Sequence, residues 1–364
     1  MELLVAKAKK HLQEELPFVL YCKPNRPEVV GFFQRDVSLF HVDDFTEKGF
    51  VISSFDGKST FLIPENESEI MRVAFENNHN IIFSEKETAT DELTKNDFKA
   101  LVNKGIESIN KSEFKKVVLS RKETLLVPNF DLIATFEKLL QIYPTTFVYC
   151  FYHPKIGIWL GATPEQLLKV SAGVFETISL AGTQKDSGNP AVTWHKKEQE
   201  EQQFVTDYIV TELSSVASDV LVTQPYSIKA GEIWHIKTDI SGRLSVDESL
   251  KKIIQMLHPT PAVCGLPKNK AKAFIIENEG YDRSFYTGYL GEMNSSMTPN
   301  VVNSDLFVNL RCMQIGDTLF RTPNTTDLVT QAHLYMGCGI TQDSIPEKEW
   351  EESVNKSMTM KKVL

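Results

Sequence analysis

Two short glutamate-rich segments combine residue types and a spacing that could hold a divalent cation. Glu198 and Glu201 lie three residues apart in the segment KEQEE. Glu349 and Glu352 repeat this spacing in the segment EWEE, one helical turn before Lys356. Because residues three or four apart share one face of a helix, two such helices would offer Mg²⁺ the oxygen ligands that it prefers. On spacing alone, glutamates in this arrangement more often form a solvated helix face.

The chain contains no other recognisable catalytic sequence pattern. It has no GxSxG, HExxH or GxxxxGK[ST] segment, and the GCG at 337–339 does not continue into a dinucleotide fingerprint. The eight histidines lack metal-ligand spacing, so His235 is interpreted as a core or hydrogen-bonding residue. The five cysteines lie far apart without a CxxC pair, which indicates buried, reduced thiols.

Length, composition and charge limit the class of protein. The 364 residues are 41% hydrophobic and 24% charged, which is typical of a chain that folds throughout. A net charge of −9, with lysines and arginines scattered along the chain, argues against nucleic acid as a partner. The N-terminal segment carries charges where a secretory signal needs an apolar core, and no later apolar run could span a bilayer. We therefore expect a cytoplasmic monomer without a nucleic-acid or membrane partner.

The elements that must position the glutamates follow from the spacing of apolar residues. Residues 1–90 predict an opening helix and then short strands, and 91–110 predict an amphipathic helix that leads into a strand at 116–120. The other predicted elements are helices at 131–143, 193–217, 245–257, 269–278 and 346–358, and strands at 146–152, 156–160, 286–291 and 304–311. Both glutamate pairs thus fall on helices. The irregular alternation, without a linker, favours one integrated α+β domain with large, mostly antiparallel sheets.

Seven segments resemble, in order, the motifs of the chorismate-utilising enzymes, a family that includes isochorismate, salicylate, anthranilate and aminodeoxychorismate synthases. They are KKVVLSR (115–121), GATPEQLL (161–168), SLAGT (179–183), KKEQEE (196–201), HPTPAVCGLP (258–267), RSFYTGYLG (283–291) and GCGITQDSIPEKEWEESVNK (337–356). Each motif is short, but seven in the family's order are hard to produce by chance. The resemblance assigns 91–364 to a chorismate-binding catalytic region and leaves 1–90 as the N-terminal, strand-rich part of the same fold.

The resemblance implies both a fold and a reaction. The fold is that of anthranilate synthase component I, in which large antiparallel sheets pack together, with flanking helices and a deep active-site cleft. The activity implied is that of an isochorismate synthase, an isomerase that adds water to chorismate and expels a hydroxyl group, with Mg²⁺ as cofactor. Its product would enter menaquinone or siderophore biosynthesis.

Two matching residues would carry the acid–base chemistry. By resemblance, Lys116 is the general base that deprotonates a water; an ordinary lysine is protonated at neutral pH, so this role requires burial or a nearby cation. Lys115 is expected to be its exposed neighbour, because adjacent strand residues face opposite ways. Glu165 matches the general acid that protonates the leaving hydroxyl, which requires a setting that keeps its carboxyl protonated near neutral pH. Without the motifs, both catalytic residues would be interpreted as surface residues.

The resemblance also assigns the metal ligands. Glu201 and Glu352 match the residues that bind Mg²⁺ directly, and Glu198 and Glu349 match the outer carboxylates. The metal would act as a Lewis acid that neutralises the ring carboxylate of chorismate.

The second carboxylate of chorismate must be bound elsewhere. Tyr286 and Arg311 match the ligands of this enolpyruvyl carboxylate, and arginine offers a two-pronged grip. Gly337 and Gly339 would present backbone N–H groups to an anion. Lys356 would add positive charge beside the metal.

The last matching positions concern the ring and the product. Gly182 and Thr183 match a loop that lies against the ring. Ala262 occupies a position where relatives that use ammonia or eliminate pyruvate typically carry threonine, whereas isochorismate synthases typically carry alanine. The hydroxyl group of threonine can form a hydrogen bond that helps to place the nucleophile or the departing group, and the methyl group of alanine cannot. We therefore expect isochorismate to be released and no glutaminase subunit to be needed.

Four residues depart from the family pattern, and two other functions stay open. Gln202 replaces a common histidine, Ser179 a common proline, Gln184 a common arginine, and Cys338 a small residue. None of these changes removes a catalytic group. The nearest alternative is a salicylate synthase, which also eliminates pyruvate. A more remote alternative is a catalytically inactive binding protein on the same fold.

Overall fold

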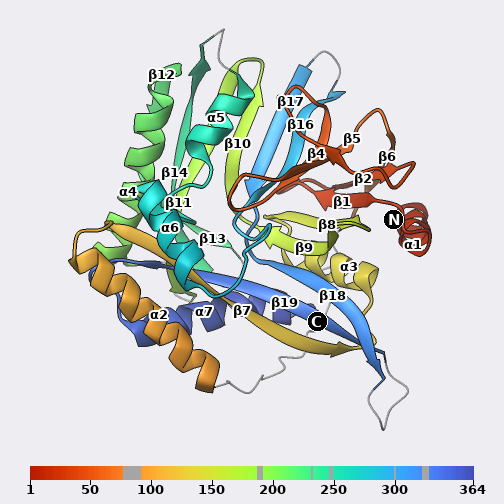
Figure 1. The fold of residues 1–364 in the computed structure, drawn as a ribbon. Helices are drawn as coiled ribbons and strands as arrows, with labels where there is room; N and C mark the ends of the chain where they lie inside the picture. The colour runs from red at the N-terminus through yellow and green to blue at the C-terminus, as the bar shows by residue number, and fades with distance from the viewer. Residues whose placement is uncertain (77–91, 187–191, 231–232, 246–248, 299–300, 322–327) are drawn as a thin grey trace.

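The computed structural model describes residues 1–76, 92–186, 192–230, 233–245, 249–298, 301–321 and 328–364, and places them in two large sheets flanked by helices (Figure 1). The first sheet contains, in spatial order, β15 (Gly265–Leu266), β7 (Lys116–Pro128), β19 (Leu328–Ile340), β18 (Cys312–Arg321), β9 (Gly157–Thr163), β8 (Phe147–His153), β1 (Phe18–Cys22), β2 (Glu28–Gln34) and β6 (Ser68–Ala74). The second contains β12 (Ala217–Val222), β14 (Ile233–Leu244), β11 (Val174–Lys185), β10 (Gln166–Ser171), β17 (Val301–Val308), β16 (Tyr289–Thr298), β4 (Gly49–Ser53), β5 (Thr60–Pro64) and β3 (Phe40–His41), and β13 (Tyr226–Ala230) also pairs with β14.

Every pairing among the described strands is antiparallel, which confirms the predicted α+β class. Residues 1–76 contribute strands to both sheets. The predicted boundary between residues 90 and 91 lies outside the described part of the chain.

Helices cover the outer faces of both sheets. They are α1 (Glu2–Gln13), α2 (Glu92–Asn110), α3 (Leu132–Ile142), α4 (Lys196–Leu213), α5 (Leu250–Leu257), α6 (Lys268–Asn278) and α7 (Pro346–Lys361). Helices α2 and α7 pack on each other and on β7 and β19, whereas α4 packs on β11 and β14 (Figure 1). The two glutamate-bearing helices, α4 and α7, therefore belong to different sheets. None of the described helices is long and apolar enough to cross a membrane.

The core explains why several strands are apolar on both faces. In β1, Phe18 and Leu20 pack into a cluster with α1 and α3, and Tyr21 on the opposite face belongs to a cluster between the sheets. In that second cluster, the rings of Phe147 from β8 and Phe307 from β17 stack with centroids 4.3 Å apart. The sequence of a strand that is covered on both faces is a continuous apolar run, rather than an alternation of apolar and polar residues. This double burial holds the two sheets against each other.

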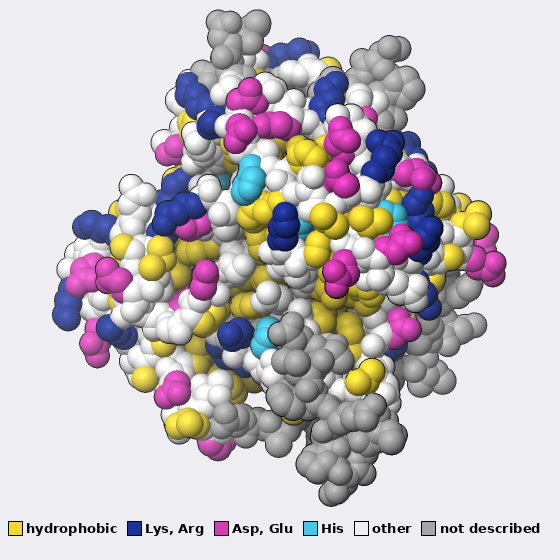
Figure 2. All heavy atoms as spheres, turned by 45° about the vertical axis from the view of Figure 1, so that its right-hand side comes forward, with side chains coloured by type: hydrophobic (Ala, Val, Ile, Leu, Met, Phe, Trp, Pro, Cys, Tyr) yellow, Lys and Arg dark blue, Asp and Glu magenta, His cyan; other side chains and the backbone are white. Residues whose placement is uncertain are grey.

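The predicted helices are confirmed within a few residues at each end, but several strands differ. The predicted strand at 286–291 begins only at Tyr289, because Ser284 and Thr287 have φ angles of 50° and 60° and form a turn. The predicted strand at 304–311 ends at Val308, and Arg311 has a φ angle of 47° in the turn that follows. The sequence patterns do not predict β10 to β14, β15, β18 or β19. On the face shown in Figure 2, acidic and basic side chains are interspersed rather than gathered by sign.

Candidate active site

A pocket brings together most of the residues that the sequence motifs single out. It is lined by Glu165, Gly182, Thr183, Glu201, Ala262, Tyr286, Arg311, Gly337, Gly339, Glu352 and Lys356, together with Val118, Pro164, Leu180, Ala181, His235, Val263, Thr287, Leu310, Tyr335 and Met336. An adjoining hollow shares Thr183 and Glu352 with this pocket and also contains Glu198 and Glu349. Strands of both sheets, and helices that pack on them, thus contribute residues to one site.

Lys116 lies behind the pocket wall at the start of β7. Its side chain is 0% exposed, and its Nζ lies 3.0 Å from Oε1 of Glu201, a pocket-lining carboxylate. Lys115 is exposed, as the alternation of strand residues predicts. A buried lysine needs a paired charge, and Glu201 supplies it.

Glu165 follows Pro164 in the turn between β9 and β10. Its side chain is 4% exposed. Burial raises its pKa to about 8, although Lys116 and Lys356 partly oppose this rise. The carboxyl therefore carries a proton at pH 7, which is the state that a general acid requires.

Two glycines of β19 let functional groups approach the backbone closely. A Cβ atom at Gly339 would lie 2.1 Å from Oε1 of Glu201, and one at Gly337 would lie 2.6 Å from the hydroxyl of Tyr286. Both distances are shorter than any non-bonded contact of a carbon atom. The structure thus gives these glycines a steric role that the sequence prediction, which invoked only their N–H groups, did not include.

Three lysines neutralise three of the four candidate metal-binding carboxylates. Besides the pair of Lys116 and Glu201, Lys197 Nζ lies 2.5 Å from Oε1 of Glu349, and Lys356 Nζ lies 2.6 Å from Oε1 of Glu352. Burial alone would raise the pKa of Glu201, but Lys116 and Lys197 outweigh it and hold that pKa below its usual value.

Two carboxylate oxygens in this cluster remain without a hydrogen-bond partner. They are Oε2 of Glu198 and Oε2 of Glu349, and both atoms are buried. Burial and the neighbouring Glu352 raise the pKa of Glu349 to about 7. Ligand atoms of Cys338, Glu349 and Glu352 lie within 4.8 Å of one another. An unpaired buried carboxylate oxygen is costly, so the donor set fits a hard cation that would accept these lone pairs.

Two residues assigned to the enolpyruvyl carboxylate are held by neighbouring rings and side chains. The ring of Tyr286 stacks on Tyr335 with centroids 5.3 Å apart and an interplanar angle of 16°. Arg311 donates from Nη1 to Oγ1 of Thr359 over 3.1 Å. Its other terminal nitrogen, Nη2, lies 3.4 Å from Nε2 of His235.

His235 is a pocket residue that the site prediction missed. It is buried on β14, and its Nδ1 lies 2.8 Å from the carbonyl oxygen of Gly182. Burial, assisted by the charge of Arg311, lowers its pKa to about 3. The neutral ring can therefore donate to Gly182 from Nδ1 and accept from Arg311 at Nε2. The hydrogen-bonding role predicted for His235 is confirmed, but only the pairing of β14 with β11 places it in the pocket.

The departures from the family pattern are accommodated locally. Gln202 and Ser179 contact each other, since Nε2 of Gln202 lies 3.3 Å from Oγ of Ser179 and also donates to Thr206 and Thr238. Cys338 is buried and donates from Sγ to the backbone oxygen of Glu349. Gln202 therefore faces hydroxyl groups rather than the glutamate cluster.

The fold is that of anthranilate synthase component I. Anthranilate synthase component I from Streptococcus pneumoniae superimposes with a TM-score of 0.66 at 17% identity, covering 94% of this chain and 92% of that chain. A crystal structure described as a putative 2,3-dihydroxybenzoate-specific isochorismate synthase, DhbC, from Bacillus anthracis superimposes with a TM-score of 0.77 at 21% identity, covering 98% of each chain. These similarities confirm the predicted fold.

Residues 56–364 match the sequence profile of the family described as chorismate binding enzyme, and the chain belongs to that family. Isochorismate synthase EntC of Escherichia coli K12 is 30% identical over 258 residues, which is 67% of this chain and 61% of that protein. The salicylate biosynthesis isochorismate synthase of Pseudomonas aeruginosa is 28% identical over 276 residues, which is 73% of this chain and 54% of that protein. The chain thus spans little more than half the length of these curated relatives.

Proposed function

We propose that this protein is an isomerase that converts chorismate to isochorismate. The observation that carries the proposal is the pairing, at one pocket, of a buried lysine beside a carboxylate with a buried glutamic acid that holds its proton at pH 7. A general acid must hold a proton in order to donate it, and this is the state that burial gives Glu165. The isochorismate synthases among the relatives support the same reaction.

In this reaction, Lys116 accepts a proton from a water molecule, whose oxygen bonds to the ring carbon beside the carboxylate-bearing carbon. The ring double bonds shift, and the carbon–oxygen bond of the hydroxyl group on the far side breaks. Glu165 gives its proton to the departing hydroxyl, so one water is consumed and one is released. No electrons are exchanged with a redox partner. Tyr286 and Arg311 hold the enolpyruvyl carboxylate in this scheme.

We propose Mg²⁺ as the cofactor, bound by Glu201 and Glu352 with Glu198 and Glu349 around them. Bound there, it would neutralise the ring carboxylate of chorismate. The unpaired oxygens of Glu198 and Glu349 support a cation at this place. Lys356, whose Nζ also donates to the carbonyl oxygen of Gly337 over 2.7 Å, would keep its position beside the cluster.

We expect the protein to bind about one Mn²⁺, a spectroscopic substitute for Mg²⁺, per chain. Replacing Glu201 with glutamine should weaken this binding at least about tenfold, because the amide carries no charge. Electron paramagnetic resonance of free Mn²⁺ measures the affinity without reference to turnover. The control is Glu200→Gln, since Glu200 is the exposed neighbour, which pairs with Lys196 on the same helix. Equal affinities in wild type and Glu201→Gln would rule out the proposed ligand set.

We expect isochorismate to be the released product, with little pyruvate and no dependence on ammonia or glutamine. The reason is Ala262, which lines the pocket and offers no hydroxyl group to a leaving enolpyruvyl group or to a nucleophile. Chromatography of a reaction with chorismate and Mg²⁺ identifies the product, and coupling to lactate dehydrogenase measures pyruvate. Stoichiometric pyruvate would indicate a salicylate synthase instead. Binding of chorismate without turnover would indicate an inactive binding protein.

A further inference from the structure

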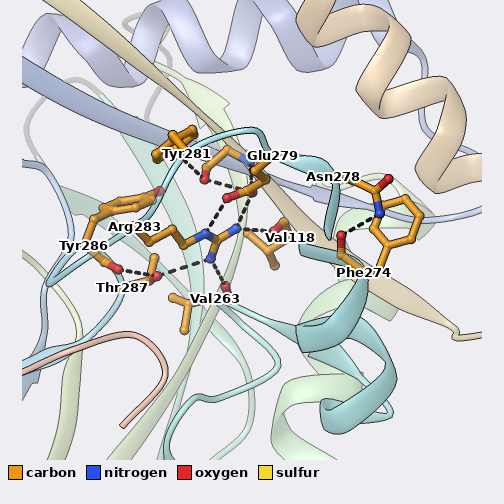
Figure 3. Close-up of polar contacts among 10 residues, drawn as sticks. Val118, Val263, Phe274, Asn278, Glu279, Tyr281, Arg283, Tyr286 and Thr287 are labelled. Atoms are coloured by element: carbon orange, nitrogen blue, oxygen red, sulfur yellow. Dashed lines mark hydrogen bonds and ion pairs between the residues drawn. The ribbon is translucent and has the colours of Figure 1, made fainter. Parts of the chain in front are cut away.

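A buried arginine lies at the meeting point of three segments of the pocket wall (Figure 3). The guanidinium group of Arg283 has five N–H donors, and the structure gives an acceptor for each of them. Nε donates to Oε2 of Glu279 over 2.7 Å, and Nη2 donates to Oε1 of Glu279 over 2.5 Å. The other three bonds run to the carbonyl oxygens of Val118 (2.7 Å) and Val263 (2.9 Å) and to Oγ1 of Thr287 (3.2 Å).

The three acceptors outside Glu279 all line the pocket, but Arg283 does not. Val118 lies on β7, two residues after Lys116, and on the same face of the strand. Val263 is the chain neighbour of Ala262. Thr287 follows Tyr286, whose ring lies 5.7 Å from the guanidinium carbon.

Glu279 links Arg283 to a further residue of β7. It follows α6, and its Oε1 also accepts from the backbone N–H of Ser120 over 2.7 Å and from Oγ of Ser120 over 2.9 Å. The side chains of Arg283 and Glu279 are only 2% and 1% exposed. A desolvated ion pair is stable only when its donors and acceptors are satisfied, and here two backbone carbonyl groups and the hydroxyl of Thr287 accept the remaining bonds of Arg283. The two side chains therefore connect β7, the Ala262 segment and the Tyr286 turn.

We propose that Arg283 and Glu279 are positioning residues, which set the relative placement of the base-bearing strand, the Ala262 segment and Tyr286 without contacting the substrate. This inference rests on the proposed function in one respect: the kinetic test measures the conversion of chorismate to isochorismate. The planar fork of arginine is what allows one side chain to bind a carboxylate and two carbonyl groups at fixed angles. Lysine offers three donors from a single atom and cannot reproduce this geometry.

The test compares Arg283→Lys and Glu279→Gln with Glu292→Gln. Glu292 is a matched control, because it is also buried and ion-paired: Lys23 Nζ lies 2.8 Å from its Oε2, and Tyr21 hydrogen-bonds to it. It is not among the residues that line the pocket. All variants should lose thermal stability. At a temperature well below each Tm, we expect kcat to fall about tenfold in Arg283→Lys and Glu279→Gln and to stay unchanged in Glu292→Gln, because small displacements of reacting groups are costly.

Hydrogen exchange adds a measurement that does not depend on turnover. We expect faster exchange in the segments around Val118, Val263 and Thr287 in Arg283→Lys and Glu279→Gln. We expect no such change in Glu292→Gln. If Arg283→Lys does not fold, Glu279→Gln carries the test, since its amide keeps the size of the side chain. A wild-type kcat together with wild-type exchange in these segments would overturn the positioning role. Failure of the wild type to form isochorismate would instead overturn the proposed function, and the exchange measurement would still decide the positioning role.

Discussion

Replacing Lys116 with alanine should lower kcat at least about a hundredfold, which is the usual scale of a general-base contribution. The structure supports this size of effect, because the side chain is buried behind the pocket wall and its Nζ lies 3.0 Å from a pocket carboxylate. Two other titratable side chains of the pocket are not available as the base, because Glu165 carries a proton and His235 is engaged by Gly182 and Arg311.

The chain itself offers the matched control for this substitution. Lys115→Ala removes the same side chain one residue earlier, where it is exposed to solvent, and should leave kcat unchanged. Steady-state kinetics with chorismate, together with circular dichroism spectra of both variants, make the comparison. Near-normal turnover in a folded Lys116→Ala variant would show that another group activates the water.

The helices that carry the glutamates could be predicted because their signal is local. Glu198 and Glu201 share a helix face at a spacing of three, and Glu349 and Glu352 repeat it. Periodicity alone, however, could not distinguish a solvated face from a buried cluster. The difference depends on the packing of α4 and α7 against separate sheets, which is a long-range contact.

Several long strands were not predicted because polar residues are buried within them. In β14, His235 and Thr238 are buried, although both side chains are polar. Both side chains find hydrogen-bond partners inside the fold, His235 with Gly182 and Thr238 with Gln202. Binary patterning fails at such positions because the burial is made possible by partners far away in the sequence.

The connection made by Arg283 and Glu279 illustrates the same limit at the site. The two residues lie four apart, a spacing that on a helix would suggest an ordinary surface ion pair. Here Glu279 ends a helix and Arg283 lies in the following turn, so the pair points inward. The acceptors of Arg283 on β7 and beside Ala262 come from segments that the sequence does not link. The motif RSFYTGYLG (283–291) includes Arg283, but the positioning role proposed for this residue follows only from its three-dimensional contacts.

The pH dependence of turnover and stability should both report on Glu165. Burial raises the pKa of its carboxyl from an ordinary value of 4.5 to about 8. Because a general acid must be protonated, kcat should decrease as the pH rises through about 8. Between pH 4.5 and about 8 the folded protein holds a proton at this site that the unfolded chain has released. The free energy of unfolding should therefore decrease as the pH rises across this range.

Replacing Glu165 with glutamine should lower kcat at least about a hundredfold and remove both pH effects, because the amide has the shape of the protonated acid but no proton to give. The variant should thus gain stability relative to the wild type as the pH increases from about 5 to about 8. Thermal denaturation of both proteins across this range measures the stability difference, and pH–rate profiles measure the loss of the acid. Lys169→Gln, a change at a half-buried residue that pairs with Glu176 on the neighbouring strand, is the control for a change of charge alone. A wild-type pH–rate profile in Glu165→Gln would exclude this residue as the acid, and a constant stability difference would show that its carboxyl is already ionised at neutral pH.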